Sequence, residues 1–255
     1  MNNYSDLFRK QELLWGKYPK EATLTGRMLP PRDQGTQSTC LDHQIAAVLQ
    51  ERNVIDPIAQ LDPTLSLSPQ WLYNHREPNP FTGQQGRGHH WRNALRLARD
   101  VGLVLEQSYP YEDKIELLDS GNPKKEYKDL YKEAKNLRAG DWGIVHNIKH
   151  VIQGFNDHAA PIMLVSAYNY GEKNNGKIWK KMKGDKYLAE HALTIVGYKW
   201  NDKNYDDGYF VLQNTWGTDW NDGGYTTMTF GEFNEKVKNI RKVSKTMMIY
   251  RIKSY

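Results

Sequence analysis

The chain of 255 residues contains a single cysteine, Cys40. One thiol excludes a disulfide within the chain, so packing and not covalent cross-links must stabilise the fold. A chain of this length buries roughly three-quarters of its unfolded surface, which is enough for a core without a disulfide or a structural metal. The lack of disulfides is typical of a protein that works in a reducing compartment.

Long hydrophobic runs are missing as well. No apolar run approaches the roughly 18 residues that a membrane-spanning helix needs, and the mean hydropathy is −0.80. The first residues, MNNYSDLFRKQELLW, lack the apolar segment of a secretory signal. We therefore expect no membrane association and a cytoplasmic or otherwise reducing location, with a leaderless secreted effector as the alternative.

A large excess of one charge is also absent. The 35 Lys and Arg residues stand against 30 Asp and Glu residues, giving a net charge of +5. This mild and dispersed charge is a weak argument for nucleic acid, so we expect no nucleic-acid partner. Lysines concentrate in residues 177–186 and 236–245. A solvated face is the expected interpretation, and attraction of an acidic partner or nucleic acid is the alternative.

Aromatic residues are abundant, at 12% of the chain with 8 Trp and 16 Tyr, which excludes a disordered protein. The first half has helical periodicity, and from Cys40 the apolar residues Leu41, Ile45 and Val48 lie on one face. Further helices are expected over residues 91–101, 127–134 and 148–155.

The second half contains short β-branched or aromatic segments bounded by Gly, Asn and Asp, which is typical of strands. The expected strands cover residues 161–168, 192–198, 209–213, 225–230 and 246–252. Helices followed by strands predict an α+β protein in which the two kinds of structure are segregated. A cleft between two such halves is a natural place for an active site.

Polar residues in distant segments form a candidate nucleophilic site. Cys40 begins a helix, whose unpaired N–H groups and positive dipole end favour the thiolate. His191, at the head of a strand, can accept the thiol proton, and Asn214, at the end of the next strand, can orient the imidazole. The Gln34 amide, with the Cys40 N–H, can stabilise an oxyanion. Trp216 would cover the His–Asn hydrogen bond. The implied chemistry is acyl transfer through a thioester.

The motifs around these residues resemble those of the papain-like cysteine peptidases. The order of Gln, Cys, His and Asn is that of the family, as is the six-residue spacing from Gln34 to Cys40. The matching segments are Asn-Thr-Trp-Gly-Thr-Asp-Trp at 214–220, Ser-Tyr-Pro-Tyr at 108–111 and Leu-Ser-Pro-Gln at 67–70. The resemblance covers roughly residues 30–230. It implies a helical lobe and an antiparallel β lobe flanking an active-site cleft, and a cysteine endopeptidase, or thiol protease, activity.

The sequence departs from the family around the nucleophile. The family's Cys-Gly-Ser-Cys-Trp is here Gln-Ser-Thr-Cys-Leu at 37–41, so a disulfide of the secreted members is lost. Asp42 would raise the thiol pKa through its charge, although an acidic residue also suits the first turn of a helix.

The resemblance also implies substrate-binding residues. The family's Gly-Gly wall appears as Arg87-Gly88, and Val165 and Ala189 match apolar positions of the main specificity pocket, with Glu190 at its edge. We expect an apolar or mixed substrate side chain one residue before the scissile position. The expected substrate-binding residues are Gly88, His89, Val165, Ala189, Glu190 and Trp216.

Three parts are expected along the chain: an N-terminal extension (1–30), a helical lobe with the nucleophile (31–140) and a β-rich lobe with the histidine and asparagine (141–255). Only about 39 residues precede Cys40, so we do not expect them to form the long inhibitory propeptide that is typical of the family. Our hypothesis is that the extension lies over the cleft.

The expected function is hydrolysis of peptide bonds in a peptide or protein substrate by a monomer that needs no metal and no cofactor. Two alternatives use the same residues. One is a catalytically silent module that binds a peptide or protein partner in the cleft. The other is a transpeptidase or amidase with the same triad.

Overall fold

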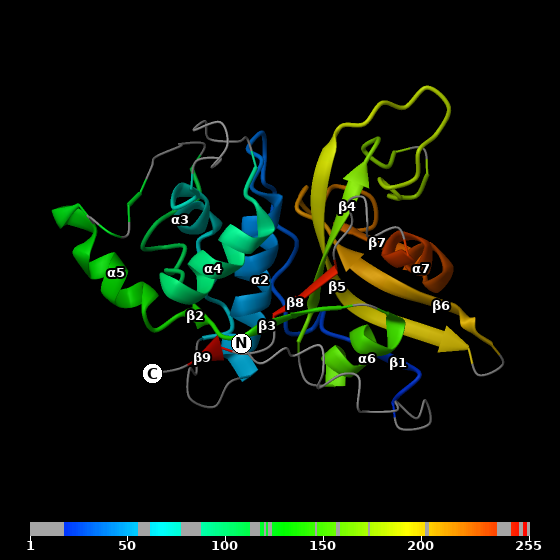
Figure 1. Ribbon diagram of the computed structural model, residues 1–255, viewed down its shortest axis with the longest axis horizontal. Helices are drawn as coiled ribbons and strands as arrows, with labels where there is room; N and C mark the ends of the chain where they lie inside the picture. Colours follow the sequence, from blue (N-terminus) through cyan, green and yellow to red (C-terminus); the bar gives the residue numbers. More distant parts are fainter. Residues whose placement is uncertain are drawn as a thin grey trace.

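The computed structural model describes residues 18–55, 62–77, 88–112, 118–119, 121, 124–145, 147–156, 159–172, 174–201, 204–238, 246–249 and 252–253. Helices gather in one lobe and most strands in the other, and the two lobes lie side by side (Figure 1). This segregation confirms the predicted α+β class.

The helical lobe is built around α2 (Cys40–Ile55), which runs along the border between the lobes (Figure 1). Helices α3 (Pro69–Asn74) and α4 (Trp91–Asp100) pack against it. Ser68 starts α3 because its side chain accepts a hydrogen bond from the Trp71 N–H at 3.1 Å. A short 3₁₀ helix (Lys125–Tyr127) leads into α5 (Lys128–Ala134) at the outer edge of the lobe.

The β lobe is an antiparallel sheet. Its described strands lie in the order β3 (Trp142–Ile144), β8 (Thr246–Ile249), β4 (Pro161–Ala167), β5 (Ala189–Asn201), β6 (Asn204–Gln213) and β7 (Tyr225–Thr229). Helices α6 (Ile148–Asn156) and α7 (Phe230–Lys238) lie beside this sheet (Figure 1). Strands β5 and β6 are longer than the sequence predicts. His191 lies near the start of β5 and Asn214 directly follows β6, so both residues lie at the same end of this strand pair.

Part of the expected N-terminal extension belongs to the sheet. Strand β1 (Glu21–Thr23) pairs with Gly197–Lys199 of β5. The pairing of β4 with β5 ends at Thr194, so the long β5 has a free edge that β1 occupies. Residues 1–17 lie outside the described residues, and the hypothesis that the extension lies over the cleft stays a prediction.

The end of β7 differs from the prediction. The sequence predicts a strand through Phe230, but the strand ends at Thr229 and α7 begins at Phe230. The Glu232 N–H donates to the Thr229 hydroxyl at 3.1 Å, and the Thr229 N–H donates to the Glu232 carboxylate at 2.9 Å. This reciprocal pair is a capping box, which starts a helix.

The predicted strand over 246–252 consists of two strands. Strand β8 belongs to the main sheet, whereas β9 (Ile252–Lys253) pairs with β2 (Arg138–Ala139). The chain therefore returns to the helical lobe after β8 (Figure 1).

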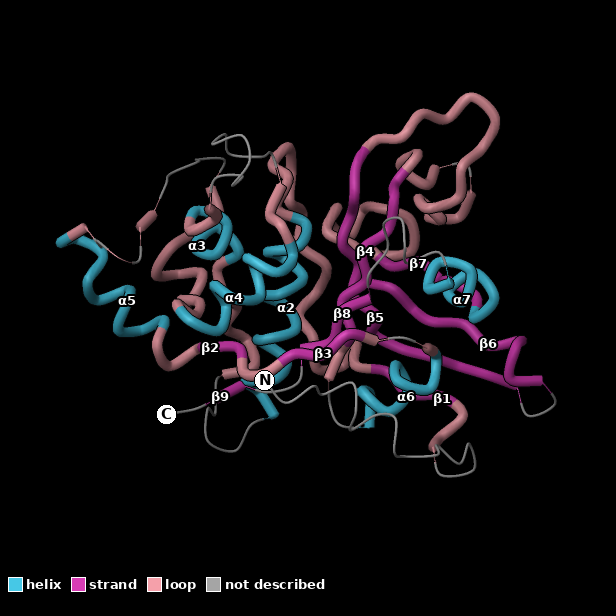
Figure 2. Tube along the Cα trace, viewed as in Figure 1, coloured by secondary structure: helices cyan, strands magenta, loops and turns pink. Residues whose placement is uncertain are grey.

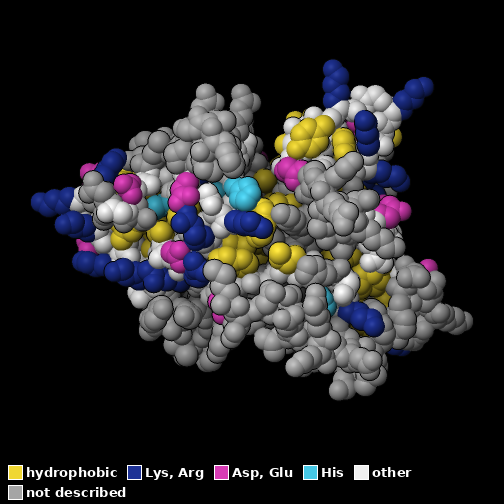
Figure 3. Space-filling view, in the orientation of Figure 1, with side chains coloured by type: hydrophobic (Ala, Val, Ile, Leu, Met, Phe, Trp, Pro, Cys, Tyr) yellow, Lys and Arg dark blue, Asp and Glu magenta, His cyan; other side chains and the backbone are white. Residues whose placement is uncertain are grey.

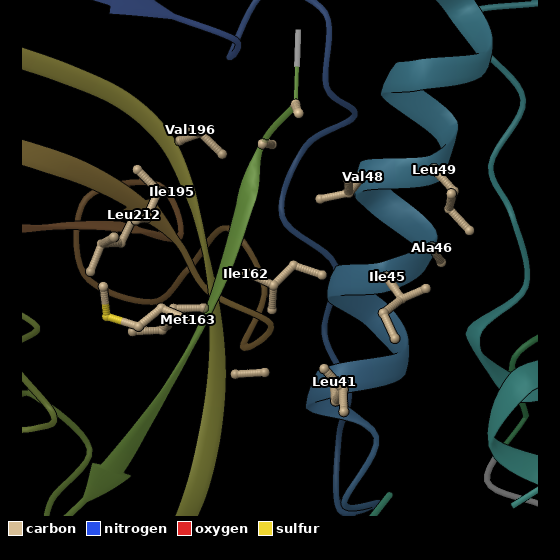
Figure 4. Packing of buried hydrophobic residues seen from close by; sticks show 14 of the residues in the cluster. Leu41, Ile45, Ala46, Val48, Leu49, Ile162, Met163, Ile195, Val196 and Leu212 are labelled. Carbon is tan, nitrogen blue, oxygen red and sulfur yellow. The ribbon is translucent and has the colours of Figure 1, made fainter. Parts of the chain in front are cut away.

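The core joins the two lobes through α2. Val48 points from α2 toward the sheet, where Ile162 of β4 points back, and Leu49 points the opposite way into the helical lobe (Figure 4). All three side chains are buried. A polar link accompanies this packing, because the Gln44 amide on α2 donates to the Gln213 carbonyl at 2.9 Å. Among the described residues, no helix combines the length and the apolar character that crossing a bilayer requires.

Candidate active site

His191 and Asn214 come together because β5 and β6 are neighbours in the sheet. Thr194 of β5 pairs with Gln213 of β6, which places Asn214 next to the start of β5. The His191 Nε2 atom lies 2.6 Å from Asn214 Oδ1. Asn214 Oδ1 also accepts the Thr215 N–H at 2.8 Å. A backbone N–H can only donate, so this atom is an acceptor and His191 Nε2 carries the hydrogen. His191 Nδ1 is then the atom that can accept a proton.

Trp216 lies over this pair. Its ring centroid is 4.7 Å from that of His191, and Trp220 packs edge-on against it at 5.4 Å. His191 and Asn214 are 5% and 1% exposed. The aromatic cover limits the access of water to the His–Asn hydrogen bond, as the sequence analysis expects.

Cys40 is the first residue of α2 and is partly exposed. Its sulfur faces the backbone N–H of Ala192, the residue that follows His191, as well as the N–H groups of Leu41 and Cys40 itself. The start of α2 is therefore joined to the start of β5, and the expected nucleophile stands across the lobe border from the expected base.

The pKa of the Cys40 thiol differs from the sequence-based expectation. Loss of water around the thiol raises its pKa to about 11, and the charge of Asp42 acts in the same direction. The N–H groups of Ala192, Leu41 and Cys40 lower the thiol pKa, as expected for a helix start, but burial outweighs them. Burial also lowers the pKa of His191 to about 4. Burial therefore disfavours the charged forms of both the Cys40 thiol and the His191 imidazole.

Gln34 is held rigidly beside the start of α2. Its side-chain carbonyl accepts from the Thr215 hydroxyl at 2.6 Å, and its amide nitrogen donates to the Gln37 carbonyl at 2.6 Å. These bonds fix which end of the amide carries the N–H groups and leave one N–H for another acceptor. Its backbone carbonyl accepts from the Tyr111 hydroxyl, also at 2.6 Å.

Thr215 and Tyr111 are supporting residues to which the sequence analysis gives no role. Tyr111 lies in the Ser-Tyr-Pro-Tyr segment, and its hydroxyl also lies 2.9 Å from that of Thr39. Through these two contacts, Tyr111 of this motif holds the loop that precedes Cys40 in place. Thr215 follows Asn214 directly, and a hydroxyl next to the expected triad asparagine is the signal that could have identified it.

His89 and Gly88 occupy the helical-lobe wall. A β-bridge joins Gly88 to Ser38, two residues before Cys40. The His89 ring is buried against Asp42, with His89 Nδ1 2.7 Å from Asp42 Oδ1, and its side chain is 1% exposed. What His89 can offer to a substrate is therefore its backbone and not its imidazole.

The remaining expected substrate residues lie on β4 and β5. Val165 pairs with His191 in the register of the sheet. Its side chain is fully buried, so it packs in the core beside His191 and is not available for contact with a substrate. Ala189 and Glu190 are exposed at the start of β5. The Ser166 hydroxyl donates to Glu190 at 3.4 Å, and partial burial raises the pKa of the Glu190 carboxyl.

A small cavity of about 30 Å³ has Asn214 in its lining. Its lining includes Asn214, His43, Gln50 and Gln213, but neither Cys40 nor His191, so it is not the substrate cleft. Among the described residues, no group of three His, Cys, Asp or Glu side chains is arranged to hold a metal ion.

Comparison with known proteins agrees with this geometry. The family model for papain family cysteine proteases matches residues 21–246. Cysteine proteinase 3 of Entamoeba histolytica is 28% identical over 207 residues, which cover 81% of this chain and 61% of that protein. A cathepsin L-like proteinase of Phaedon cochleariae is 26% identical over 209 residues, or 78% of this chain and 56% of that protein. The chain thus spans about three-fifths of the length of these relatives.

Solved structures share the fold. Xylellain, a cysteine protease from Xylella fastidiosa, superposes with a TM-score of 0.72 at 21% identity, covering 95% of this chain and 90% of that one. A Carica candamarcensis cysteine protease in complex with E-64 has a TM-score of 0.62 at 21% identity, covering 92% of this chain and 100% of that one. With the family model matching most of its length, this chain belongs to the papain family of cysteine proteases.

Proposed function

We propose that this chain is a peptidase that hydrolyses peptide bonds through a thioester on Cys40. The observation that carries the proposal is the His191–Asn214 hydrogen bond of 2.6 Å, held beneath Trp216 next to the start of α2. A tautomer with Nδ1 unprotonated gives His191 a lone pair for the thiol proton. The family membership of the chain supports the same reaction class.

Burial disfavours the charged forms of the Cys40 thiol and the His191 imidazole, so we expect proton transfer to accompany attack. The Cys40 sulfur bonds to the substrate carbonyl carbon while its proton passes to His191 Nδ1. The Cys40 N–H and the second N–H of the Gln34 amide donate hydrogen bonds that stabilise the negative charge on the carbonyl oxygen. His191 then gives its proton to the leaving amine as the C–N bond breaks, and water hydrolyses the thioester.

The test is cleavage of an unbiased peptide library, read by mass spectrometry, with Cys40→Ala as the control. New peptide termini that depend on Cys40 would support the proposal. Ligated products would identify a transpeptidase instead. Retention of peptides without cleavage by the wild-type chain would identify a binding module, and either result would overturn the proposal.

A further inference from the structure

The connection between β4 and β5, residues 168–188, projects from the β lobe as a long loop (Figure 2). It carries four of the six large hydrophobic side chains that are exposed in the described part of the chain. They are Tyr170 (60% exposed), Met182 (40%), Tyr187 (55%) and Leu188 (44%). A cluster of exposed apolar side chains on one segment is typical of an interaction site.

The same connection is rich in lysine. Residues 168–190 contain six lysines and three acidic residues. Lys180, Lys181, Lys183 and Lys186 are all exposed. These four lysines and the four apolar residues above form what we call the rim patch. Hydrophobic and basic side chains lie together on this part of the surface in the space-filling view (Figure 3).

Two of the three acidic residues of this segment, Asp185 and Glu190, accept hydrogen bonds from neighbouring groups, whereas the third, Glu172, is exposed. The Asp185 carboxylate accepts from the Asn169 amide at 2.9 Å and from the Met182 N–H at 2.9 Å. Glu190 accepts from Ser166 and from Tyr187. With six lysines against three acidic residues, the segment keeps a net positive charge beside its exposed apolar side chains.

The rim patch is continuous with the catalytic centre. Leu188 lies three residues before His191, and its N–H is bound to the Ala167 carbonyl at the end of β4. On the other side, the Tyr170 ring is 5.5 Å from the Trp216 ring, which itself covers His191. A polypeptide in the cleft can therefore extend onto the patch without a break.

We propose that the rim patch binds acidic segments of protein substrates in which Asp or Glu alternates with apolar residues. This inference rests on the proposed peptidase function and adds a substrate class to it. Opposite charges raise the rate of encounter, and the apolar side chains supply contact area. Met182 and Leu188 are aliphatic, which suits peptide side chains, whereas Tyr170 and Tyr187 can also stack on bases, so the test below includes a nucleic acid.

The experiment measures binding to full-length Cys40→Ala by fluorescence anisotropy, so that binding is read without cleavage. The probe is a labelled twelve-residue peptide in which Glu alternates with Leu. Matched probes replace Glu with Lys or Leu with Ser, and a fourth probe is a single-stranded oligonucleotide.

The charge variant replaces Lys180, Lys183 and Lys186 with Glu. The matched control replaces Lys125, Lys128 and Lys135 with Glu, which changes the net charge equally on exposed residues of the helical lobe. An apolar variant combines Met182→Ser with Leu188→Ser.

We expect the Glu-Leu probe to bind, with affinity falling as salt rises. The charge variant should weaken binding about tenfold or more and the control should weaken it far less, because screening limits the effect of distant charges. The apolar variant should also weaken binding. Equal effects of the two charge variants would overturn the inference. Tighter binding of the oligonucleotide, insensitive to the apolar variant, would overturn it in favour of nucleic acid.

A failure of the proposed function has a different signature. The wild-type chain would then cleave no peptide in the library, although the Glu-Leu probe still bound at the rim patch. Cleavage of short peptides without binding of the probe would instead overturn the inference and leave the proposed function standing.

Discussion

The Nδ1 atom of His89 lies 2.7 Å from Oδ1 of Asp42, and both side chains are buried, at 1% and 0% exposure. Asp42 is in the first turn of α2, two residues after Cys40, and His89 follows Gly88 on the wall of the cleft. The pair therefore joins α2, the helix that begins at Cys40, to the segment that contains Gly88 and His89. Because the Asp42 charge raises the pKa of the Cys40 thiol, the same carboxylate also opposes formation of the thiolate.

The first prediction separates the charge of Asp42 from its hydrogen bond. Asp42→Asn keeps a carbonyl oxygen for His89 but removes the charge, so the pKa of the Cys40 thiol should fall. Alkylation of this single cysteine by iodoacetamide at pH 8, followed by intact mass, should become about threefold faster. Asp129→Asn on the exposed side of α5 is the control. An unchanged alkylation rate in Asp42→Asn would contradict the electrostatic role.

The second prediction concerns the division of roles between His191 and Asn214. His191→Ala should lower kcat/KM about a thousandfold, because the proton acceptor is lost. Asn214→Ala should cost less, about ten- to a hundredfold, since Asn214 orients the imidazole but transfers no proton. The measurement is hydrolysis of a fluorogenic peptide, with circular dichroism to check folding. Losses of equal size would argue against an orienting role.

The third prediction concerns stability in acid. Burial lowers the pKa of His43 to about 3 and the pKa values of His75 and His191 to about 4. The unfolded chain binds protons at these residues near pH 6.5, whereas the folded chain does not. Their stabilising contribution is therefore complete above pH 6.5 and is lost as the pH falls toward 4.

Each of these histidines should lower the free energy of unfolding by up to about 1.4 kcal/mol per pH unit in that window. Burial raises the pKa of Glu51, which acts in the opposite direction and offsets part of the loss. Urea unfolding followed by tryptophan fluorescence at pH 7, 6 and 5 measures the slope. His43→Met should reduce the slope by about one third. A stability that does not change from pH 7 to pH 5 would refute the assignment.

The fourth prediction concerns Gly102, which ends α4. Its φ is +91°, and an added Cβ would lie 1.9 Å from the Ala134 carbonyl oxygen. Gly102→Ala should therefore destabilise the fold by about 3 kcal/mol or more, through backbone strain and overpacking. Gly184 has nearly the same φ, +92°, with open space around it, so Gly184→Ala should cost only about 1–2 kcal/mol. Equal shifts in the urea midpoint would show that the close approach to Ala134 has no effect.

Local periodicity was sufficient to predict α2, α4, α5 and α6 and the strands β4 to β8, but it missed α3, α7 and the short strands β1, β2, β3 and β9. The apolar face that starts at Leu41 predicts α2, and the β-branched segments predict β4 and β6, because in each case the pattern is contained in the segment itself. The short segment Glu21–Thr23 has no such pattern. It becomes β1 only through pairing with Gly197–Lys199, some 175 residues away. A pattern within the segment itself contains no information about so distant a partner.

A local signal was available for α7 and was outweighed. Thr229 and Glu232 have the spacing of a capping box, but the aromatic Phe230 favoured continuation of the strand. The candidate site shows the same limit. The motifs predict Cys40, His191 and Asn214 as the triad, whereas the burial that raises the pKa of Cys40 and the pairing of Asp42 with His89 both depend on tertiary packing.

The bonds between Gln34 and Thr215 bridge 181 residues of chain. At roughly 5–20 residues per second, a ribosome needs about 9–36 s to proceed from the first of these residues to the second. For most of that interval the residues of α2 have been synthesised, but neither the Gln34–Thr215 hydrogen bond nor the His191–Asn214 hydrogen bond can exist. A growing chain therefore lacks the assembled arrangement of Gln34, Cys40, His191 and Asn214, which exists only once the β lobe has packed against α2.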